Sequence, residues 1–167
     1  MSFSAPDTLD MSTPAAKREA YETLAAQLSS LLEGERDMVA NLAQFSALVW
    51  QCVPSLNWAG FYLARGEQLV LGPFQGKVAC VRIPFGRGVC GTCAATLAPQ
   101  IVKDVHAFPG HIACDSASNS ELVLPVIAGG AFKGVLDLDS PVLARFDEVD
   151  AAGLARMVGI LAEGTDW

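Results

Sequence analysis

The stretch ELVLPVIAGGAFKGVLDLD, residues 121–139, contains two apolar runs on either side of Gly129-Gly130. Runs rich in valine, leucine and isoleucine that flank a glycine pair are typical of a β-hairpin. The sequence therefore predicts paired antiparallel strands over residues 121–128 and 133–138. The other elements can be placed around this hairpin.

Acidic residues occupy one face of the predicted hairpin. Successive side chains of a strand point to opposite faces, so Asp137 and Asp139 share one face and the leucines beside them share the other. If the hairpin loop has three or five residues, Glu121 falls opposite Asp139 on that same face. A solvated strand face is the simpler alternative, but it does not require two acids side by side. We therefore expect a cluster of carboxyl groups.

Helical patterns surround the strands. Apolar residues recur at helical spacing near both ends of the chain, and Thr13-Pro14 and Asp147 are typical helix starts. Helices before and after an antiparallel sheet favour an α+β domain. We expect a central antiparallel sheet of five or six strands, with the N- and C-terminal helices on one face and substrate loops on the other. The expected helices are residues 14–33, 38–52, 87–97 and 148–163, and the further strands are residues 57–63, 68–74, 78–83 and 100–105.

Length and composition restrict the class of protein. With 167 residues, of which 51% are apolar, the chain fits one domain, at residues 14–167, after a flexible tail at residues 1–13. The net charge of -7 provides no basic surface for nucleic acid or an anionic membrane. No apolar run approaches the roughly 18 residues of a membrane span, and no basic leader is present. We expect a cytoplasmic protein.

Four of the five cysteines and both histidines lie between residues 80 and 114. An odd number of cysteines in a chain of this size fits reactive or buried thiols in a reducing compartment. Any of them could instead pack as a small apolar side chain, as we expect for Cys52. Cys90-Gly91-Thr92-Cys93 could also be a thioredoxin-type pair or half of a zinc site, but the remaining Cys and His spacings are irregular. We therefore expect no metal.

Four segments together resemble one enzyme family. They are NWAGFY (57–62), FGRGVCGT (85–92), PGHIACD (109–115) and GVLDLD (134–139), and they look like the free methionine-(R)-sulfoxide reductases, which are small stand-alone GAF-type domains. The resemblance implies that residues 14–167 form a single GAF-like catalytic domain. It also implies an enzyme of oxidative stress that acts on the free amino acid, uses no bound cofactor, is recycled by thioredoxin and is commonly a homodimer.

The resemblance also implies roles for individual residues. The matching positions are the catalytic Cys114, the main resolving Cys80, the accessory Cys90, the substrate-facing acids Glu121, Asp137 and Asp139, and the aromatic pocket residues Trp58 and Tyr62. Cys93 departs from the family, which more often has a small residue there. This departure leaves open a disulfide between Cys90 and Cys93.

Sulfoxide reduction by thiols sets chemical requirements on these residues. A thiolate must attack the sulfoxide sulfur, an acid must protonate the departing oxygen, and a second thiol must condense with the resulting sulfenic acid. Carboxyl groups held close together repel one another when they are all ionised, so the pKa of at least one should rise. That group would stay protonated near neutral pH and could donate a proton. The same acids disfavour a thiolate at Cys114. A thiolate therefore requires nearby positive charge or N–H donors. The candidates are His111, Arg87, loop N–H groups and the positive end of the helix near Cys90.

The sequence thus predicts thiol-dependent reduction of free methionine-(R)-sulfoxide through a cysteine sulfenic acid and an intramolecular disulfide recycled by thioredoxin. The alternative is a non-catalytic GAF domain that senses a small molecule or an oxidant, because one fold can serve either purpose. Against this alternative, we expect no effector domain or signalling coiled coil, and a sensor has no need of three separated cysteines and the acids that face them.

Overall fold

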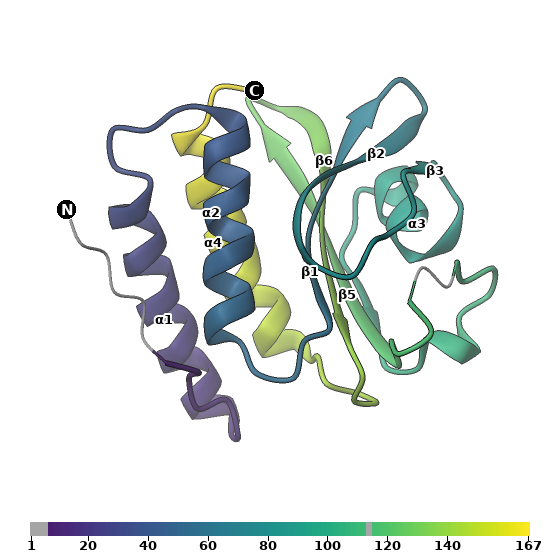
Figure 1. The fold of residues 1–167 in the computed structure, drawn as a ribbon, viewed down its shortest axis with the longest axis horizontal. Coiled ribbons are helices and arrows are strands. Elements are labelled where there is room, and N and C mark those ends of the chain that lie inside the picture. The colour runs from purple at the N-terminus through teal and green to yellow at the C-terminus, as the bar shows by residue number, and fades with distance from the viewer. Residues whose placement is uncertain (1–6, 113–114) are drawn as a thin grey trace.

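The structure, a computed structural model, describes residues 7–112 and 115–167. Its centre is a six-stranded antiparallel sheet with the strand order β3-β2-β1-β6-β5-β4. Helices α2 and α4 lie on one face, α1 packs against them as an outer layer, and α3 lies on the other face (Figure 1). The elements are α1 (Pro14–Leu31), α2 (Met38–Cys52), β1 (Trp58–Arg65), β2 (Gln68–Gly76), β3 (Arg82–Pro84), α3 (Gly88–Thr96), β4 (Gln100–Val102), the 3-10 helix η1 (Val105–Ala107), β5 (Ser120–Ala128), β6 (Ala131–Ser140) and α4 (Glu148–Gly164).

The predicted α+β architecture and both predicted helix starts are confirmed. The Thr13 hydroxyl oxygen accepts a hydrogen bond from the Ala16 N–H at the start of α1. Asp147 caps α4 in a reciprocal capping box with Asp150. Within the part of the chain that the structure describes, no helix has both the length and the apolar character needed to cross a membrane.

The strands at the two edges of the sheet are shorter than expected. β3 consists of Arg82–Pro84 alone, and the strand expected at residues 100–105 stops at Val102. Asp104 explains the second difference, because its side chain accepts a hydrogen bond from the His106 N–H and begins η1. The backbone therefore leaves the ladder before the predicted strand end.

The β5–β6 hairpin reaches the predicted register by a route that the sequence did not indicate. Its loop consists of Gly129 and Gly130, both with positive φ, rather than three or five residues. A one-residue bulge of β6 at Lys133 compensates for the shorter loop. Glu121 consequently pairs with Asp139, as expected.

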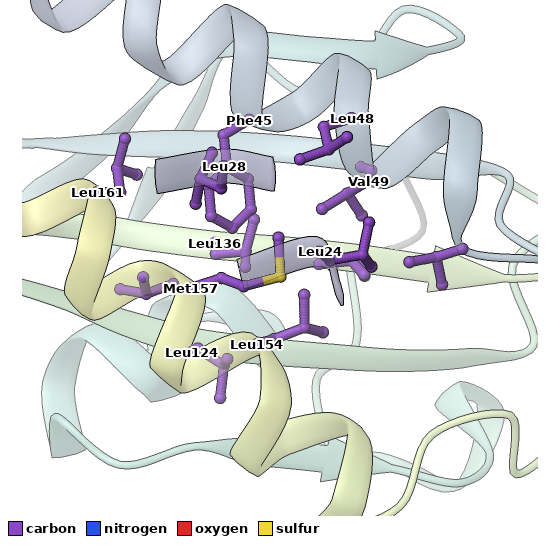
Figure 2. Close-up of a cluster of buried hydrophobic side chains, with 14 of the residues drawn as sticks. Leu24, Leu28, Phe45, Leu48, Val49, Leu124, Leu136, Leu154, Met157 and Leu161 are labelled. Carbon is purple, nitrogen blue, oxygen red and sulfur yellow. The ribbon is translucent and has the colours of Figure 1, made fainter. Parts of the chain in front are cut away.

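The sheet separates two apolar layers. On the helical side, the leucines of β5 and β6 meet apolar side chains of α1, α2 and α4 (Figure 2). A smaller cluster on the other side contains Trp58, Tyr62 and residues of α3. Leu136 and Leu138 are fully buried against the helices, whereas Asp137 between them belongs to the opposite face. The helical layer therefore carries most of the hydrophobic burial, and the opposite face combines a smaller apolar cluster with polar groups.

The described part of the N-terminal segment contacts the domain. The Leu9 N–H donates to the Cys52 carbonyl oxygen at 2.9 Å. Met11 is 8% exposed and belongs to the main core. The division into a tail at residues 1–13 and a domain at residues 14–167 stays a prediction, but these two residues pack as an arm.

A buried polar cluster joins α1 to α4. Lys17 forms ion pairs with Asp147 and with the fully buried Asp150. Tyr21 donates its hydroxyl to Asp150 Oδ1 at 2.8 Å, and Arg145 Nη1 lies 3.2 Å from the same oxygen. Two cations and a hydroxyl thus compensate the one buried carboxylate, as a buried charge requires.

Gly153 of α4 allows the ring of Tyr21 to reach this cluster. A Cβ at position 153 would lie 2.2 Å from Tyr21 Cγ and 2.6 Å from Tyr21 Cβ. These atoms are close to the backbone of α1, so the ring cannot simply turn aside. We expect Gly153→Ala to lower the free energy of unfolding by about 1–3 kcal/mol, measured by chemical denaturation.

Gly159 in the same helix provides the matched control. Nothing lies within 4 Å of a Cβ at this position, and alanine is the better helix former. Gly159→Ala should therefore raise the free energy of unfolding by up to about 1 kcal/mol. Equal effects of the two substitutions would contradict a specific contact between Gly153 and Tyr21.

Candidate active site

A cavity lies on the face of the sheet opposite α2 and α4. Its walls come from β1, β5 and β6, from the segments before β3 and β5, and from the start of α3. The predicted site residues found in its lining are Trp58, Tyr62, Cys90, Glu121, Asp137 and Asp139. The structure therefore brings together side chains from four separate elements that the sequence had identified one by one.

Three carboxyl groups meet in this cavity. Glu121 and Asp137 are each 6% exposed, and strand pairing places Glu121 opposite Asp139. On the other side of β6, β1 places Trp58 opposite Asp139. The predicted common face of the acids is confirmed, and it is the buried face rather than a solvated one.

Helix α3 adds a thiol to the carboxyl groups. Cys90 Sγ lies 3.9 Å from Glu121 Oε1, and one donor atom from each of Cys90, Glu121 and Asp137 lies within 4.8 Å of the other two. Gly91 lets α3 approach this closely, because a Cβ there would lie 2.5 Å from the Pro84 carbonyl oxygen. Asp137 Oδ1 is buried and has no hydrogen-bond partner among the described residues. The cluster can therefore still accept a donor or a cation.

Burial dominates the protonation of this cluster. It raises the pKa values of Glu121, Asp137 and Asp139, and a neighbouring carboxylate raises each of them further. The predicted raised carboxyl pKa is thus confirmed, and a protonated carboxyl is available as a donor. Burial, followed by the charges of Asp137 and Glu121, also raises the pKa of the Cys90 thiol. Cys90 therefore lacks the thiolate character of a ready nucleophile.

His111 does not offset the negative charge at neutral pH. Its Nε2 lies 3.6 Å from Glu121 Oε2, but burial lowers the pKa of the imidazole below its usual value of 6.5. Arg87, which precedes α3 as its N-cap, also lines the cavity and keeps its charge. Of the two side chains expected to compensate the acids, Arg87 is the permanent cation.

Aromatic rings form one wall. The rings of Trp58 and Tyr62 are stacked with centroids 5.7 Å apart, and Phe74 stacks on Trp58 at 5.1 Å. Trp58 donates its indole N–H to the Lys77 carbonyl oxygen, and Tyr62 donates its hydroxyl to the Cys80 carbonyl oxygen at 2.9 Å. The wall is therefore fixed in orientation and also holds the backbone of Cys80.

The remaining cysteines differ in state. Cys80 is disulfide-bonded, whereas Cys90 and Cys93 are buried free thiols, so the disulfide left open between those two is not formed. Cys114 lies outside the described residues, but Ile112 and Asp115, two residues before it and one residue after it, line the cavity. Cys52 is buried in the main core, as expected.

Polar residues that sequence reasoning did not assign connect the segment before β5 to β1. Asn57 donates from Nδ2 to Asp115 Oδ2 at 3.1 Å and to Ser118 Oγ at 3.0 Å. Lys77 Nζ lies 3.6 Å from Asp115 Oδ1. Asn57 and Asp115 stand within the segments that carried the family resemblance, which was the one available signal. No feature of the sequence pointed to Ser118, because its role depends on the tertiary contact with Asn57.

The raised pKa of Asp137 can be tested through the pH dependence of stability. Its folded-state pKa lies well above the ordinary value of 3.8, so above pH 3.8 the folded state binds more protons than the unfolded state. The contribution of Asp137 to stability is therefore present at low pH and is lost as pH rises through the folded pKa. Relative to wild type, Asp137→Asn should gain stability as pH rises from about 4 towards neutral, measured as thermal unfolding across that range.

Asp147 provides a control with the opposite sign. Burial acts to raise the pKa of Asp147, but hydrogen bonds from Lys17 and from the Asp150 N–H outweigh it and lower the pKa to about 2. The stability difference between Asp147→Asn and wild type should stay level above pH 4 and shrink as pH falls towards about 2. A level difference for Asp137→Asn over the same neutral range would contradict the raised pKa of Asp137.

Comparison with known proteins agrees with this geometry. The chain matches the GAF domain family over residues 40–164. It is 52% identical over 145 residues to the free methionine-R-sulfoxide reductase of Escherichia coli, which covers 87% of this chain and 88% of that protein.

Solved structures give the same picture. A putative GAF sensor protein from Burkholderia vietnamiensis is 57% identical with a TM-score of 0.87, covering 89% of this chain and 95% of that one. The free methionine-R-sulfoxide reductase from Neisseria meningitidis in complex with its substrate is 43% identical with a TM-score of 0.87, covering 96% and 95%. The chain therefore belongs to the GAF-domain family of free methionine-R-sulfoxide reductases.

Proposed function

We infer that this protein reduces free methionine-(R)-sulfoxide to methionine. The observation that carries this conclusion is the buried cluster of Glu121, Asp137 and Asp139 beside the Trp58–Tyr62 wall, in a chain of this family. An amino-acid substrate has a cationic ammonium group at one end and a methyl-sulfinyl group at the other. The cavity offers partners of matching chemistry to both ends.

The acids account for a preference for the free amino acid. A buried carboxylate needs a cation or hydrogen bonds to remain ionised, and Asp137 Oδ1 has no partner among the described residues. The substrate ammonium supplies both the charge and the donors. A methionine sulfoxide within a peptide has no ammonium group, so it would leave the acids uncompensated. We expect discrimination against it to arise mainly at this end of the cavity.

The aromatic wall accounts for binding of the other end. The stacked rings of Trp58 and Tyr62 are held by hydrogen bonds to backbone carbonyl oxygens, so they present a rigid apolar surface. A methyl group and a sulfur atom pack favourably on such rings. The sulfinyl oxygen would then face the carboxyl groups, from which it can receive a proton.

The reaction uses two cysteines in succession. The Cys114 thiolate attacks the sulfoxide sulfur, and a protonated carboxyl of the cluster gives its proton to the oxygen. Methionine leaves as the thioether, and Cys114 retains the oxygen as a sulfenic acid. The Cys80 thiol then condenses with the sulfenic acid, which releases water and forms a disulfide. The disulfide-bonded state of Cys80 supports its role as the resolving cysteine.

Cys90 fits a secondary role. Its thiol is buried beside the carboxyl groups, and burial raises its pKa, so it is a poor attacking group in the resting site. We propose that Cys90 contacts the substrate and serves as an accessory resolving thiol. Arg87 lines the same cavity, and we propose that its charge favours the Cys114 thiolate.

Other properties complete the proposal. The oxygen ends as water and the electrons come from thiols, so the reaction needs no bound cofactor. The resulting disulfide requires an external dithiol, for which we propose thioredoxin. Such recycling requires a reducing compartment, which the odd number of cysteines also favours, so we place the protein in the cytoplasm. We further propose a homodimer, as the family resemblance implies.

A single-turnover experiment tests this function. Reduced protein is mixed with a slight excess of free methionine-(R)-sulfoxide without a reductant, and released methionine and titratable thiols are counted. We expect about one methionine released and two thiols lost per chain, because one sulfenic acid consumes one resolving thiol. Peptide mapping should then identify a disulfide between Cys80 and Cys114.

Cysteine variants separate the roles. Cys114→Ser should release no methionine, because the attacking thiolate is lost. Cys80→Ser should still release about one methionine but turn over at least tenfold more slowly with thioredoxin, because a slower thiol must resolve the sulfenic acid. Cys93→Ser is the matched control, since Cys93 is buried and does not line the cavity. Full activity of Cys114→Ser would refute the assignment, and binding without methionine release by wild type would favour a sensor.

A further inference from the structure

The thiol and two of the carboxyl groups that we assign to the reduction also form a compact set of possible metal ligands. Donor atoms of Cys90, Glu121 and Asp137 all lie within 4.8 Å of one another, and all three residues are buried. They come from α3, β5 and β6, so no spacing pattern in the sequence revealed them as a set. His111 Nε2 lies 3.6 Å from the second Glu121 oxygen and adds a nitrogen donor. One sulfur and two carboxylate groups therefore converge on one point, and the imidazole lies beside the other oxygen of Glu121.

The separations are near those of a tetrahedral metal site. Zinc binds sulfur at about 2.3 Å and nitrogen or oxygen at about 2.0–2.2 Å, which places neighbouring tetrahedral ligands about 3.4–3.7 Å apart. The Cys90–Glu121 and His111–Glu121 separations are 3.9 Å and 3.6 Å. A side-chain shift of a few tenths of an ångström would bring Cys90 Sγ and Glu121 Oε1 to ligand distance. His111 lies beside Glu121 Oε2, so it would join the same ion only after a larger rotation of its ring or of the Glu121 carboxyl group.

A second observation indicates a missing positive partner. Asp137 Oδ1 is buried and lines the cavity, yet it has no hydrogen-bond partner among the described residues. Such an orphaned acceptor is costly unless a donor or a cation meets it. A divalent cation would satisfy the orphaned oxygen and compensate the carboxylates together.

We propose that Cys90, Glu121 and Asp137, with His111 as a fourth ligand, bind one thiophilic divalent cation of the zinc class when substrate is absent. The donor set selects the ion. Thiolate and imidazole favour zinc, cobalt or cadmium, whereas magnesium and calcium require oxygen ligands throughout. Binding displaces the protons of the thiol and of any protonated carboxyl to solvent, so affinity rises with pH.

The consequence for activity rests on the proposed function. The cation would occupy the carboxyl groups that we assign to the substrate ammonium, and it would hold the Cys90 sulfur. Zinc should therefore inhibit in competition with free methionine sulfoxide rather than assist the reaction. Release of the cation would restore an active site without any covalent change.

Cobalt is the probe for a direct test, because its bond to sulfur produces a charge-transfer absorption band and its visible bands report tetrahedral coordination. The experiment uses the full chain carrying Cys80→Ser and Cys114→Ser, so that neither proposed redox cysteine can bind the metal. We expect one equivalent of cobalt to bind with a sulfur band and tetrahedral bands, and one equivalent of zinc to displace it.

Further substitutions in that background locate the ligands. Cys90→Ser should abolish the sulfur band, whereas Cys93→Ser, which changes the other buried thiol of α3, should retain it. Asp137→Asn should weaken cobalt binding at least tenfold, as expected for loss of a ligand. Circular dichroism of each variant checks that the fold persists.

The outcomes distinguish this inference from the proposed function. No sulfur band, or a band that survives Cys90→Ser, would overturn the metal site while leaving the single-turnover result untouched. A band that depends on Cys90, together with a wild-type protein that releases no methionine in the single-turnover experiment, would support the metal site and refute the reductase. Failure of excess free methionine sulfoxide to displace cobalt would overturn competition at a shared site.

Discussion

The pairing of β6 with β1 on one side and β5 on the other is the constraint on which the rest depends. β6 carries Asp137 and Asp139, and the pairing with β5 sets Glu121 opposite Asp139. A slip of one residue would turn the acids into the helical core and the leucines into the cavity. Gly134 secures the approach to β1, because a Cβ there would lie 2.1 Å from the Tyr62 carbonyl oxygen. Backbone geometry thus protects the register of the site.

The two faces of this sheet divide stability and chemistry between them. Against the helices, Leu122, Leu124, Leu136 and Leu138 are almost wholly buried, and burial of such side chains stabilises by about 1.5–3 kcal/mol each. On the other face, the same strands bury carboxyl groups whose raised pKa values show that ionisation is unfavourable there. The burial of these leucines against the helices therefore compensates for a site whose buried acids destabilise the fold at neutral pH.

The same GAF fold appears in this chain, in a putative sensor and in reductases, so the fold alone does not define the activity. Here the activity follows from a few groups on one sheet face and the adjoining loop. The buried acids provide a proton donor, and when they ionise they need a positive partner. Either the ammonium of a substrate or a thiophilic metal ion can be that partner, so the same cavity fits both the proposed reduction and the proposed metal site.

The sequence by itself determined the α+β order, the helix starts at Thr13 and Asp147, and the common face of Asp137 and Asp139, because these depend on local periodicity and capping. Tertiary structure decided the rest. The bulge at Lys133 sets the register that the loop length does not, and packing of α3 brings Cys90 to Glu121. Burial, a property of the assembled fold, raises the carboxyl pKa values and neutralises the imidazole beside them. No spacing along the chain encodes that environment.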